Sequence, residues 1–328
     1  MGQANEPKHY LKTVVEEIAA IIDEDKRQIT NRGLLILIGA YGIESLSTDP
    51  HLCHELAETA LNQLIRTRYG IALLDSADPA AACSEILRPL QARLPTQTWR
   101  SSTQITYQQF STPSPIAYLA AYLLNLRSND IAIEPSCGTG SLAVWAHAAG
   151  ATVITNEIDR RRRGLATYLG LDPTGHDAEF IDDLLPKNVI PNVILANPPF
   201  SSSGGRTERN QRKFGFRHVE SALRRLCAGG RFAVILGESG SLRSGSGKIF
   251  WESQSPDIRV TASIELPGKE YYRNGTTVGV TLVLGYKLGK EDYNAPASVE
   301  NSFIISASSV EDAFEKALSA GLRFKPSS

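Results

Sequence analysis

The sequence predicts an α/β protein whose mostly parallel sheet is preceded by a small helical region. Short apolar runs of strand length alternate with helical segments from about residue 130 onward, a pattern typical of βαβ units. The first 95 residues instead repeat their apolar side chains with the 3.6-residue period of helices. The length of 328 residues is consistent with about two domains of roughly 150 residues each.

The N-terminal region is expected to hold three helices, around residues 11–22, 52–70 and 79–94. We expect the second to end near Gly70. Asp78 and Pro79 suit the start of the third, in which Pro89 should kink the helix or end it early. The apolar run 34–38 is either a strand or a buried helix. The region is interpreted as a cap packed on a larger domain, with a partner- or DNA-docking module as the alternative.

Seven apolar runs of strand length are expected to form the sheet. Crossovers between parallel strands are right-handed, so the loops after the strands meet at one edge. The fifth and sixth runs look like a hairpin or edge pair, which predicts an antiparallel edge strand. The tail after Lys290 supplies the last run and a helix that Ser309 and Asp312 begin as a capping box. The runs are 130–134, 151–156, 192–196, 231–236, 258–266, 276–286 and 303–305.

The composition is that of an ordinary globular protein, with 42% hydrophobic and 21% charged residues, which excludes a disordered or fibrous chain. The net charge of −1 means that a nucleic-acid partner needs a local basic surface. The four cysteines form no CxxC pair, which argues against a zinc site and a disulfide framework. Neither a membrane span of about 20 apolar residues nor a secretory signal is recognisable, so we expect a cytoplasmic protein of a prokaryote or of a phage-infected host.

A glycine-rich turn follows the first strand and opens a helix, with the sequence Glu134-Pro135-Ser-Cys-Gly138-Thr-Gly140. The glycines let the backbone turn tightly and approach a ligand. Glu157, at the end of the next strand, can bind ribose hydroxyls. This pattern predicts an adenosine-containing cofactor. It does not distinguish a dinucleotide from S-adenosylmethionine.

A second motif, Asn197-Pro198-Pro199-Phe200, follows the third strand. Two consecutive prolines hold the backbone extended at the edge where ligands bind. The Asn197 side-chain oxygen and the Pro198 carbonyl can accept the two N–H groups of an exocyclic amine, which is otherwise a poor nucleophile. Phe200 offers a flat face for a base that has left the duplex stack. These four residues are therefore predicted to be catalytic.

The two motifs resemble those of the S-adenosylmethionine-dependent N6-adenine DNA methyltransferases, above all the modification subunits of type I systems and related type II enzymes. The resemblance covers roughly residues 107–287 and implies a Rossmann-like methyltransferase fold with a seven-stranded sheet. It implies S-adenosylmethionine as the cofactor, DNA as the partner, and Asn197 among the residues that touch the cofactor. It also implies that Glu157 binds the ribose and Ile158 the adenine of the cofactor. Weaker hints resemble methylase regions joined to strawberry-notch-type helicases in phage and mobile-element proteins.

Two further segments are similar to cofactor-binding elements of that family. Gln109, Phe110 and Thr112 lie in a segment that resembles its F-x-T-P element, which implies contacts with the methionine end of the cofactor. Asp182 begins an acid-x-L-L element whose carboxylate meets the cofactor adenine, and the neighbouring Asp183 is an alternative.

The resemblance implies a helical region (1–95), a catalytic domain (96–290) and a short C-terminal extension (291–328). Many family members carry a long C-terminal recognition domain, whereas only about 40 residues follow the predicted strand at 276–286 here. Recognition of the DNA target sequence is then expected to depend on the N-terminal helices or on a separate specificity, helicase or nuclease subunit. Alternatively, the specificity for a target sequence is relaxed.

A basic segment directly follows the Asn-Pro-Pro-Phe motif. Residues 201–217 hold five cations against one acid. Our hypothesis is a loop that grips the phosphate backbone near the flipped base, with a merely solvated loop as the alternative. The residues assigned to DNA binding are Arg206, Arg209, Arg212 and Lys213.

The sequence thus predicts a site-specific DNA methyltransferase that acts on adenine N6 without a metal. The same motif occurs in enzymes that methylate RNA bases or a protein glutamine, so these substrates are alternatives. A non-catalytic subunit of a modification or defence complex is another. An NAD-dependent dehydrogenase would leave the Asn-Pro-Pro-Phe motif unexplained.

Overall fold

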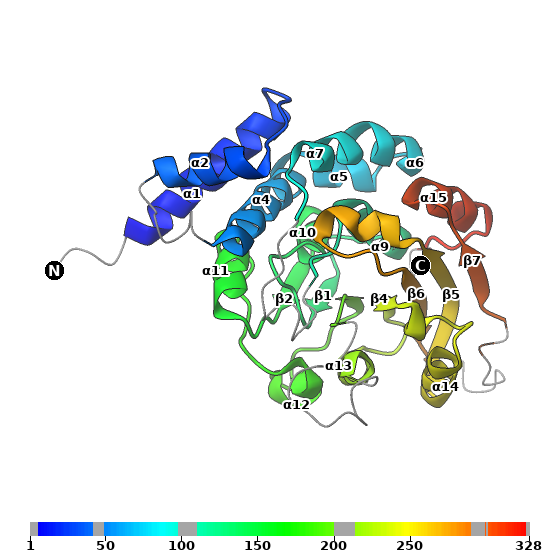
Figure 1. Cartoon of the computed structure of the whole chain (residues 1–328). Helices are drawn as coiled ribbons and strands as arrows, with labels where there is room; N and C mark the ends of the chain where they lie inside the picture. Colours follow the sequence, from blue (N-terminus) through cyan, green and yellow to red (C-terminus); the bar gives the residue numbers. More distant parts are fainter. Residues whose placement is uncertain are drawn as a thin grey trace.

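The structure is a computed structural model that describes residues 6–41, 49–97, 110–199, 214–289, 299 and 301–325 (Figure 1). Its centre is a seven-stranded sheet with the order β2-β1-β3-β4-β6-β5-β7. Every neighbouring pair is parallel except those of β6, which runs antiparallel to both β4 and β5. The predicted fold class is therefore confirmed. The strands are β1 (Ile131–Glu134), β2 (Thr152–Thr155), β3 (Val193–Ala196), β4 (Arg231–Gly237), β5 (Ile258–Leu266), β6 (Val280–Lys287) and β7 (Phe303–Ser306).

The position of the antiparallel strand differs from the expectation, because β6 lies inside the sheet and not at its edge. The strand is buried from Val280 to Gly285, as befits a strand that is covered on both faces. The edge is formed instead by β7, whose Phe303 and Ile304 are substantially exposed.

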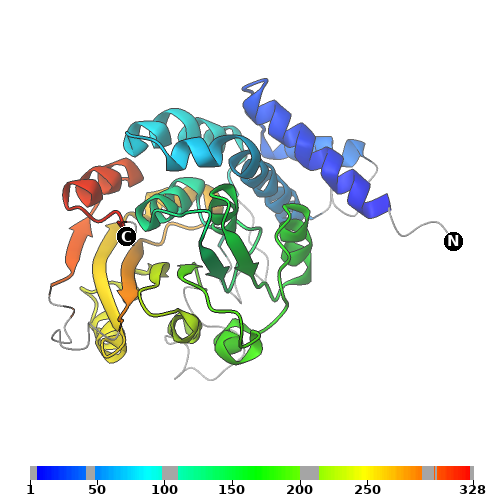
Figure 2. The ribbon, with the colours of Figure 1, turned by 180° about the vertical axis from the view of Figure 1, so that it is seen from behind.

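Alternating side chains of the strands divide the core into two layers. In β3, Val193 and Leu195 join one hydrophobic cluster, whereas Ile194 and Ala196 join the other, as the two-residue period of a strand requires. Helices therefore cover both faces of the sheet (Figures 1 and 2). One face carries α12 (Ile181–Leu184), α13 (Phe214–Arg225) and α14 (Gly245–Gln254), and the other carries α9 (Ser114–Leu124), α10 (Ala143–Ala148), α11 (Arg160–Tyr168), α15 (Val310–Ser319) and the N-terminal helices.

The N-terminal region is helical, and residues 34–38 belong to a helix. The expectation that the second helix ends near Gly70 is wrong, because a π-helical turn leads directly into the next helix. Pro89 does not end the helical path, which continues to Arg93. A second π-helical turn precedes it, so Pro89 lies in the first turn of α7 (Arg88–Arg93), where its missing N–H is tolerated. No helix in the described ranges is long and apolar enough to cross a bilayer. The elements are α1 (Glu6–Asp23), α2 (Asn31–Ala40), α4 (Pro50–Leu64), η1 (Ile65–Tyr69), α5 (Gly70–Leu74), α6 (Pro79–Ala82), η2 (Cys83–Leu87) and α7 (Arg88–Arg93).

Gly70 is a point of close packing. A Cβ atom added there would lie 2.6 Å from the Cβ of Ala148 in α10 and 2.6 Å from the carbonyl oxygen of Ile65. The absent side chain thus lets the N-terminal helices approach α10.

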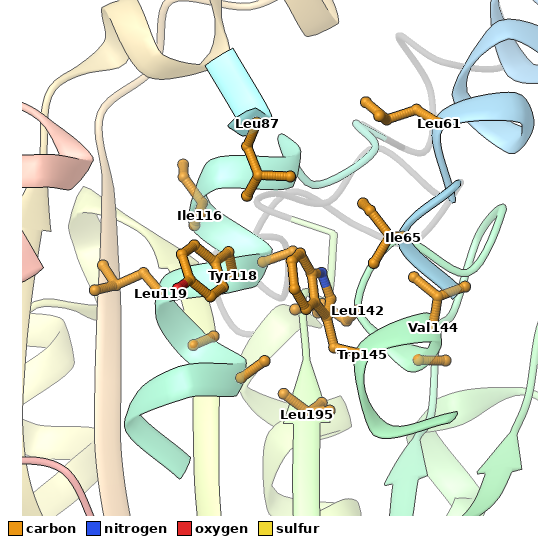
Figure 3. Close-up of a cluster of buried hydrophobic side chains, with 14 of the residues drawn as sticks. Leu61, Ile65, Leu87, Ile116, Tyr118, Leu119, Leu142, Val144, Trp145 and Leu195 are labelled. Atoms are coloured by element: carbon orange, nitrogen blue, oxygen red, sulfur yellow. The ribbon is translucent and has the colours of Figure 1, made fainter. Parts of the chain in front are cut away.

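The N-terminal helices and the sheet share one continuous core, as Figure 3 shows. Leu61, Ile65 and Leu87 of the N-terminal helices belong to the same cluster as Tyr118 of α9 and Trp145 of α10. The rings of Tyr118 and Trp145 stack with their centroids 5.1 Å apart. The helical region is therefore packed on the sheet through apolar side chains.

Arg88 joins the N-terminal and C-terminal parts of the chain. Its guanidinium lies 2.7 Å from a carboxylate oxygen of Glu311 in α15 and 2.7 Å from one of Glu270. Glu270 is buried and lies in the 3-10 segment η6 (Gly268–Asn274). Burial alone would raise the pKa of Glu311, but hydrogen bonds from Arg88 lower that pKa to about 2.

Candidate functional site

The loops that follow β1, β2 and β3 meet at the carboxyl edge of the sheet. In the first of them, Gly138 and Gly140 have φ angles of 56° and 94°, a region that favours glycine. A Cβ atom on Gly140 would also lie 2.6 Å from Cδ1 of Leu171. Both the backbone conformation and the packing of this turn therefore require glycine.

Glu134 and Pro135 fix the glycine loop through buried hydrogen bonds. Oε2 of Glu134 accepts a hydrogen bond of 2.7 Å from the backbone N–H of Ala143, at the start of α10. Burial raises the pKa of Glu134 well above its ordinary value, and Glu157 adds to this. The Pro135 carbonyl accepts a hydrogen bond of 2.9 Å from Nδ2 of Asn156. Direct contact of Glu134 or Pro135 with a cofactor stays a prediction.

Glu157 lies beside the glycine loop, at the end of β2. Its Oε2 accepts a hydrogen bond of 2.7 Å from the N–H of Gly138, and its Oε1 accepts one of 2.8 Å from the N–H of Asp159. Burial raises the pKa of Glu157, although Arg162 and these hydrogen bonds favour the charged form. Each oxygen retains a lone pair with which a ribose hydroxyl could bond. The neighbouring Ile158 is 58% exposed, which suits an apolar contact with an adenine ring.

Asn156 is a site residue that the sequence analysis missed. Its buried amide donates to the carbonyls of Pro135 and His176, and it accepts hydrogen bonds from the Thr174 hydroxyl and the His176 N–H. All the main hydrogen-bonding positions of the side chain are thus used. Asn156 ties the glycine loop to the segment after α11. Its position at a strand end, next to Glu157, is the signal that the sequence contains.

Asn197, at the end of β3, presents a free side-chain oxygen. Its Nδ2 donates to Oγ1 of Thr112 at 2.8 Å, to the carbonyl of Phe110 at 3.3 Å and to the hydroxyl of Tyr271 at 3.4 Å. Its Oδ1 is buried and has no hydrogen-bond partner among the described residues. Such an unpaired acceptor costs about 1–3 kcal/mol. This arrangement is typical of an oxygen that is kept for a ligand.

Thr112 and Tyr271 orient the Asn197 amide. Thr112 was expected at the methionine end of a cofactor, and the structure adds its contact with Asn197, which joins the two predicted motifs. Tyr271 is fully buried in η6 and also hydrogen-bonds Thr112. Burial raises the pKa of Tyr271, so its hydroxyl stays protonated. The sequence analysis missed Tyr271, which lies 74 residues beyond Asn197.

Asp182 is hydrogen-bonded by two side chains of α13. Its carboxylate accepts a hydrogen bond of 2.6 Å from the hydroxyl of Ser221 and one of 3.0 Å from the guanidinium of Arg224. Burial would raise the pKa of Asp182, but these two hydrogen bonds lower it. Asp183 is exposed. The contact of either aspartate with a cofactor adenine stays a prediction.

Pro198 and Pro199 are packed against the start of α13. A Cβ atom on Gly215 would lie 2.8 Å from the carbonyl oxygen of Pro199, so this contact also depends on glycine. The other predicted site residues lie outside the described residues: Gln109, Phe200, Arg206, Arg209, Arg212 and Lys213.

Helix α4 contributes a polar face to the site, which the sequence analysis did not predict. Arg162 is 5% exposed, and its Nε lies 3.1 Å from Oε1 of Glu55 on α4. One turn along, Glu58 accepts a hydrogen bond of 3.4 Å from the hydroxyl of Thr139. Asn62 donates to the carbonyl of the same Thr139 at 3.3 Å. Helix α4 thus packs directly on the glycine loop.

Solved structures with the same architecture are known, although no family model matches the chain. One, from Listeria monocytogenes, is described as a candidate class I S-adenosylmethionine-dependent methyltransferase. It is 14% identical with a TM-score of 0.55, and the match covers 98% of this chain and 99% of that one. Another is the modification subunit of a candidate type I restriction enzyme from Vibrio vulnificus, 14% identical with a TM-score of 0.50. Here the match covers 89% of this chain and 62% of that one, so this chain spans under two thirds of its length. The chain therefore has the Rossmann-like methyltransferase fold.

Proposed function

We propose that this protein transfers a methyl group from S-adenosylmethionine to an exocyclic amine, the N6 amino group of adenine in DNA. The Asn197 amide carries the proposal. Three protein oxygens hold its Nδ2, while its buried Oδ1 has no partner among the described residues. The amide is already oriented, so its oxygen can accept an N–H of an amine once the ligand has displaced what covers that oxygen.

The chemistry of the amine explains why such an acceptor helps. The nitrogen lone pair is delocalised into the ring, so the nitrogen attacks poorly. Hydrogen bonds from its two N–H groups to Asn197 Oδ1 and the Pro198 carbonyl favour the form in which the lone pair is localised. The proton released after methylation goes to solvent, because an asparagine amide is not a base.

The residues at the carboxyl edge fit the cofactor. S-adenosylmethionine supplies an electrophilic methyl group when it is bound. We assign its ribose to Glu157, its adenine to Ile158, and its methionine end to Phe110 and Thr112. The positive φ angles of Gly138 and Gly140 allow the backbone to approach a ligand here.

Two features favour DNA over the alternative substrates. The segment 201–217 places five cations against one acid directly after the catalytic motif. The fold is also that of a modification subunit of a candidate type I restriction enzyme. A separate specificity, helicase or nuclease subunit and a prokaryotic or phage-infected cytoplasm belong to the same proposal.

The test is methyl transfer from labelled S-adenosylmethionine to unmethylated duplex DNA, with RNA and protein extract in parallel. Mass spectrometry of digested nucleosides should show N6-methyladenine. Label only in RNA or protein would reassign the substrate. Cofactor binding without transfer to any polymer would point to a missing subunit or to a non-catalytic role.

The variant Asn197→Ala should lower methyl transfer by at least about 100-fold, the loss expected when a fixed group that polarises the reacting atoms is removed. Cofactor affinity, measured by calorimetry, should fall far less than methyl transfer does. Asn301→Ala, at an exposed position, is the matched control. Equal loss of cofactor binding and activity would show that Asn197 acts structurally.

A further inference from the structure

A small cavity with polar and apolar lining lies between the N-terminal helices and the glycine loop. Its volume is about 40 Å³, enough for a small polar group. Its lining includes Glu58 and Asn62 of α4, together with Thr112 and Ser141. The cavity therefore adjoins both segments that the proposed function assigns to the cofactor.

Glu58 bridges these two segments. One carboxylate oxygen accepts a hydrogen bond of 3.4 Å from the hydroxyl of Thr139 in the glycine loop. The Ser111 hydroxyl, next to Thr112, also hydrogen-bonds the carboxylate. The other oxygen accepts a hydrogen bond of 3.4 Å from Nδ2 of Asn274. All of these donors are neutral.

Among the described residues, no salt bridge to Glu58 is present. Arg161 and Arg162 both form ion pairs with Glu55, one turn earlier on α4. Within 4.0 Å of Glu58, the described residues offer no ion pair, and Arg162 acts on it only from a distance. Burial raises the pKa of Glu58 to about 7, against the opposing effect of the Ser111 hydrogen bond and Arg162. A carboxylate in such an environment gains from a cationic ligand.

We infer that the Glu58 carboxylate binds the α-ammonium group at the methionine end of S-adenosylmethionine. This inference rests on the proposed function. The ammonium group brings three N–H donors and a positive charge to a carboxylate whose donors among the described residues are all neutral. Thr112, which lines the same cavity, is then available for the adjoining α-carboxylate. Helix α4 thereby becomes part of the cofactor site.

The test compares three nucleosides by calorimetry on the whole chain. S-adenosylmethionine and S-adenosylhomocysteine carry the α-ammonium group, whereas 5′-methylthioadenosine lacks the amino-acid end. We expect Glu58→Gln to lower the affinity for S-adenosylmethionine and S-adenosylhomocysteine by about 10- to 100-fold, the effect of one charge-assisted hydrogen bond. Binding of 5′-methylthioadenosine should stay within twofold. Glu85→Gln, an exposed glutamate of η2, is the matched control and should change none of the three.

A double-mutant cycle isolates the contact. S-adenosylhomocysteine with hydrogen in place of its α-amino group should bind the wild type and Glu58→Gln equally. Unchanged binding of S-adenosylhomocysteine to Glu58→Gln would overturn the inference, and so would an equal loss for all three nucleosides. If the wild type binds none of them, the proposed function itself fails.

The pH dependence of binding provides a second readout. Glu58 is protonated below about pH 7, so wild-type affinity for S-adenosylhomocysteine should rise between pH 5.5 and 7.5. Other groups that face Glu58 are Glu55 and His54 on α4, Arg162 on α11, and Arg273, which lines the cavity. Desolvation lowers the pKa of His54 to about 4, so it is neutral throughout this range. The pKa of Glu157, the proposed ribose ligand, is also raised, so its contribution is measured with 5′-methylthioadenosine. A rise for S-adenosylhomocysteine in Glu58→Gln as large as in the wild type, and larger than the rise for 5′-methylthioadenosine, would contradict the assignment.

Discussion

The orientation of a single amide decides whether Asn197 can bind an amine. Rotated by 180°, the side chain would offer its NH₂ group to the ligand and its oxygen to the protein. Thr112 Oγ1 and the Phe110 carbonyl prevent this, because both accept from Nδ2. The carbonyl has no proton to donate, so a rotated oxygen would face another oxygen.

Tyr271→Phe tests how much of this orientation comes from the phenol. The variant removes the hydrogen bond of 3.4 Å to Asn197 Nδ2 and the hydrogen bond to Thr112, and it leaves the ring in place. We expect kcat to fall by about 3- to 10-fold, which corresponds to roughly 0.5–1.5 kcal/mol. KM for the cofactor should be unchanged. Tyr286→Phe, on β6, is the control, and a change in KM alone would argue against a positioning role.

The helices and strands of the chain were largely predictable because each depends on local residue patterns. The run 258–266 coincides with β5, and Asp78 caps its helix by accepting from the N–H of Ala81. The place of β6 within the sheet was not predictable, because strand order depends on contacts between distant segments.

The same distinction holds for the site. The motifs around Gly138 and Asn197 were visible because each lies within a few consecutive residues. Glu58 contacts Thr139 across 81 residues, and no local pattern records that contact. Gly70 was misread because its pattern of flanking residues is that of a helix end, whereas its role is close packing with Ala148.

A pair of glycine substitutions separates packing from helix propensity. Gly70→Ala should lower the free energy of unfolding by about 1–3 kcal/mol, because the new methyl group overlaps Ala148 and the Ile65 carbonyl. Gly164→Ala, in α11, should raise it by about 0.4–1 kcal/mol, because no atom lies within 4 Å of the added group. Urea unfolding followed by circular dichroism measures both. Equal effects of the two substitutions would refute the close contact at Gly70.

At the scale of the whole molecule, Arg88 connects three parts of the chain. It lies in the N-terminal helices and pairs with α15 and with η6, the segment that also carries Tyr271. The Glu270 side chain is 3% exposed, so its carboxylate pairs with Arg88 and has little contact with water.

Arg88→Met should therefore lower the free energy of unfolding by about 2 kcal/mol, since it leaves a buried carboxylate without its cation. The comparison is Arg27→Met, whose pair with Asp25 is exposed and should contribute less than about 1 kcal/mol. Thermal unfolding of both variants tests the difference. A loss no greater for Arg88→Met than for Arg27→Met would show that the buried pair adds no stability.

The shared core also has a consequence for how the chain is made. Leu61 and Ile65 emerge from the ribosome well before Leu195, with which they share a hydrophobic cluster. At about 5–20 residues per second, the delay is on the order of ten seconds. During this time the apolar face of α4 has no sheet to cover. The core that covers α4 is therefore complete only after the chain has been synthesised as far as β3.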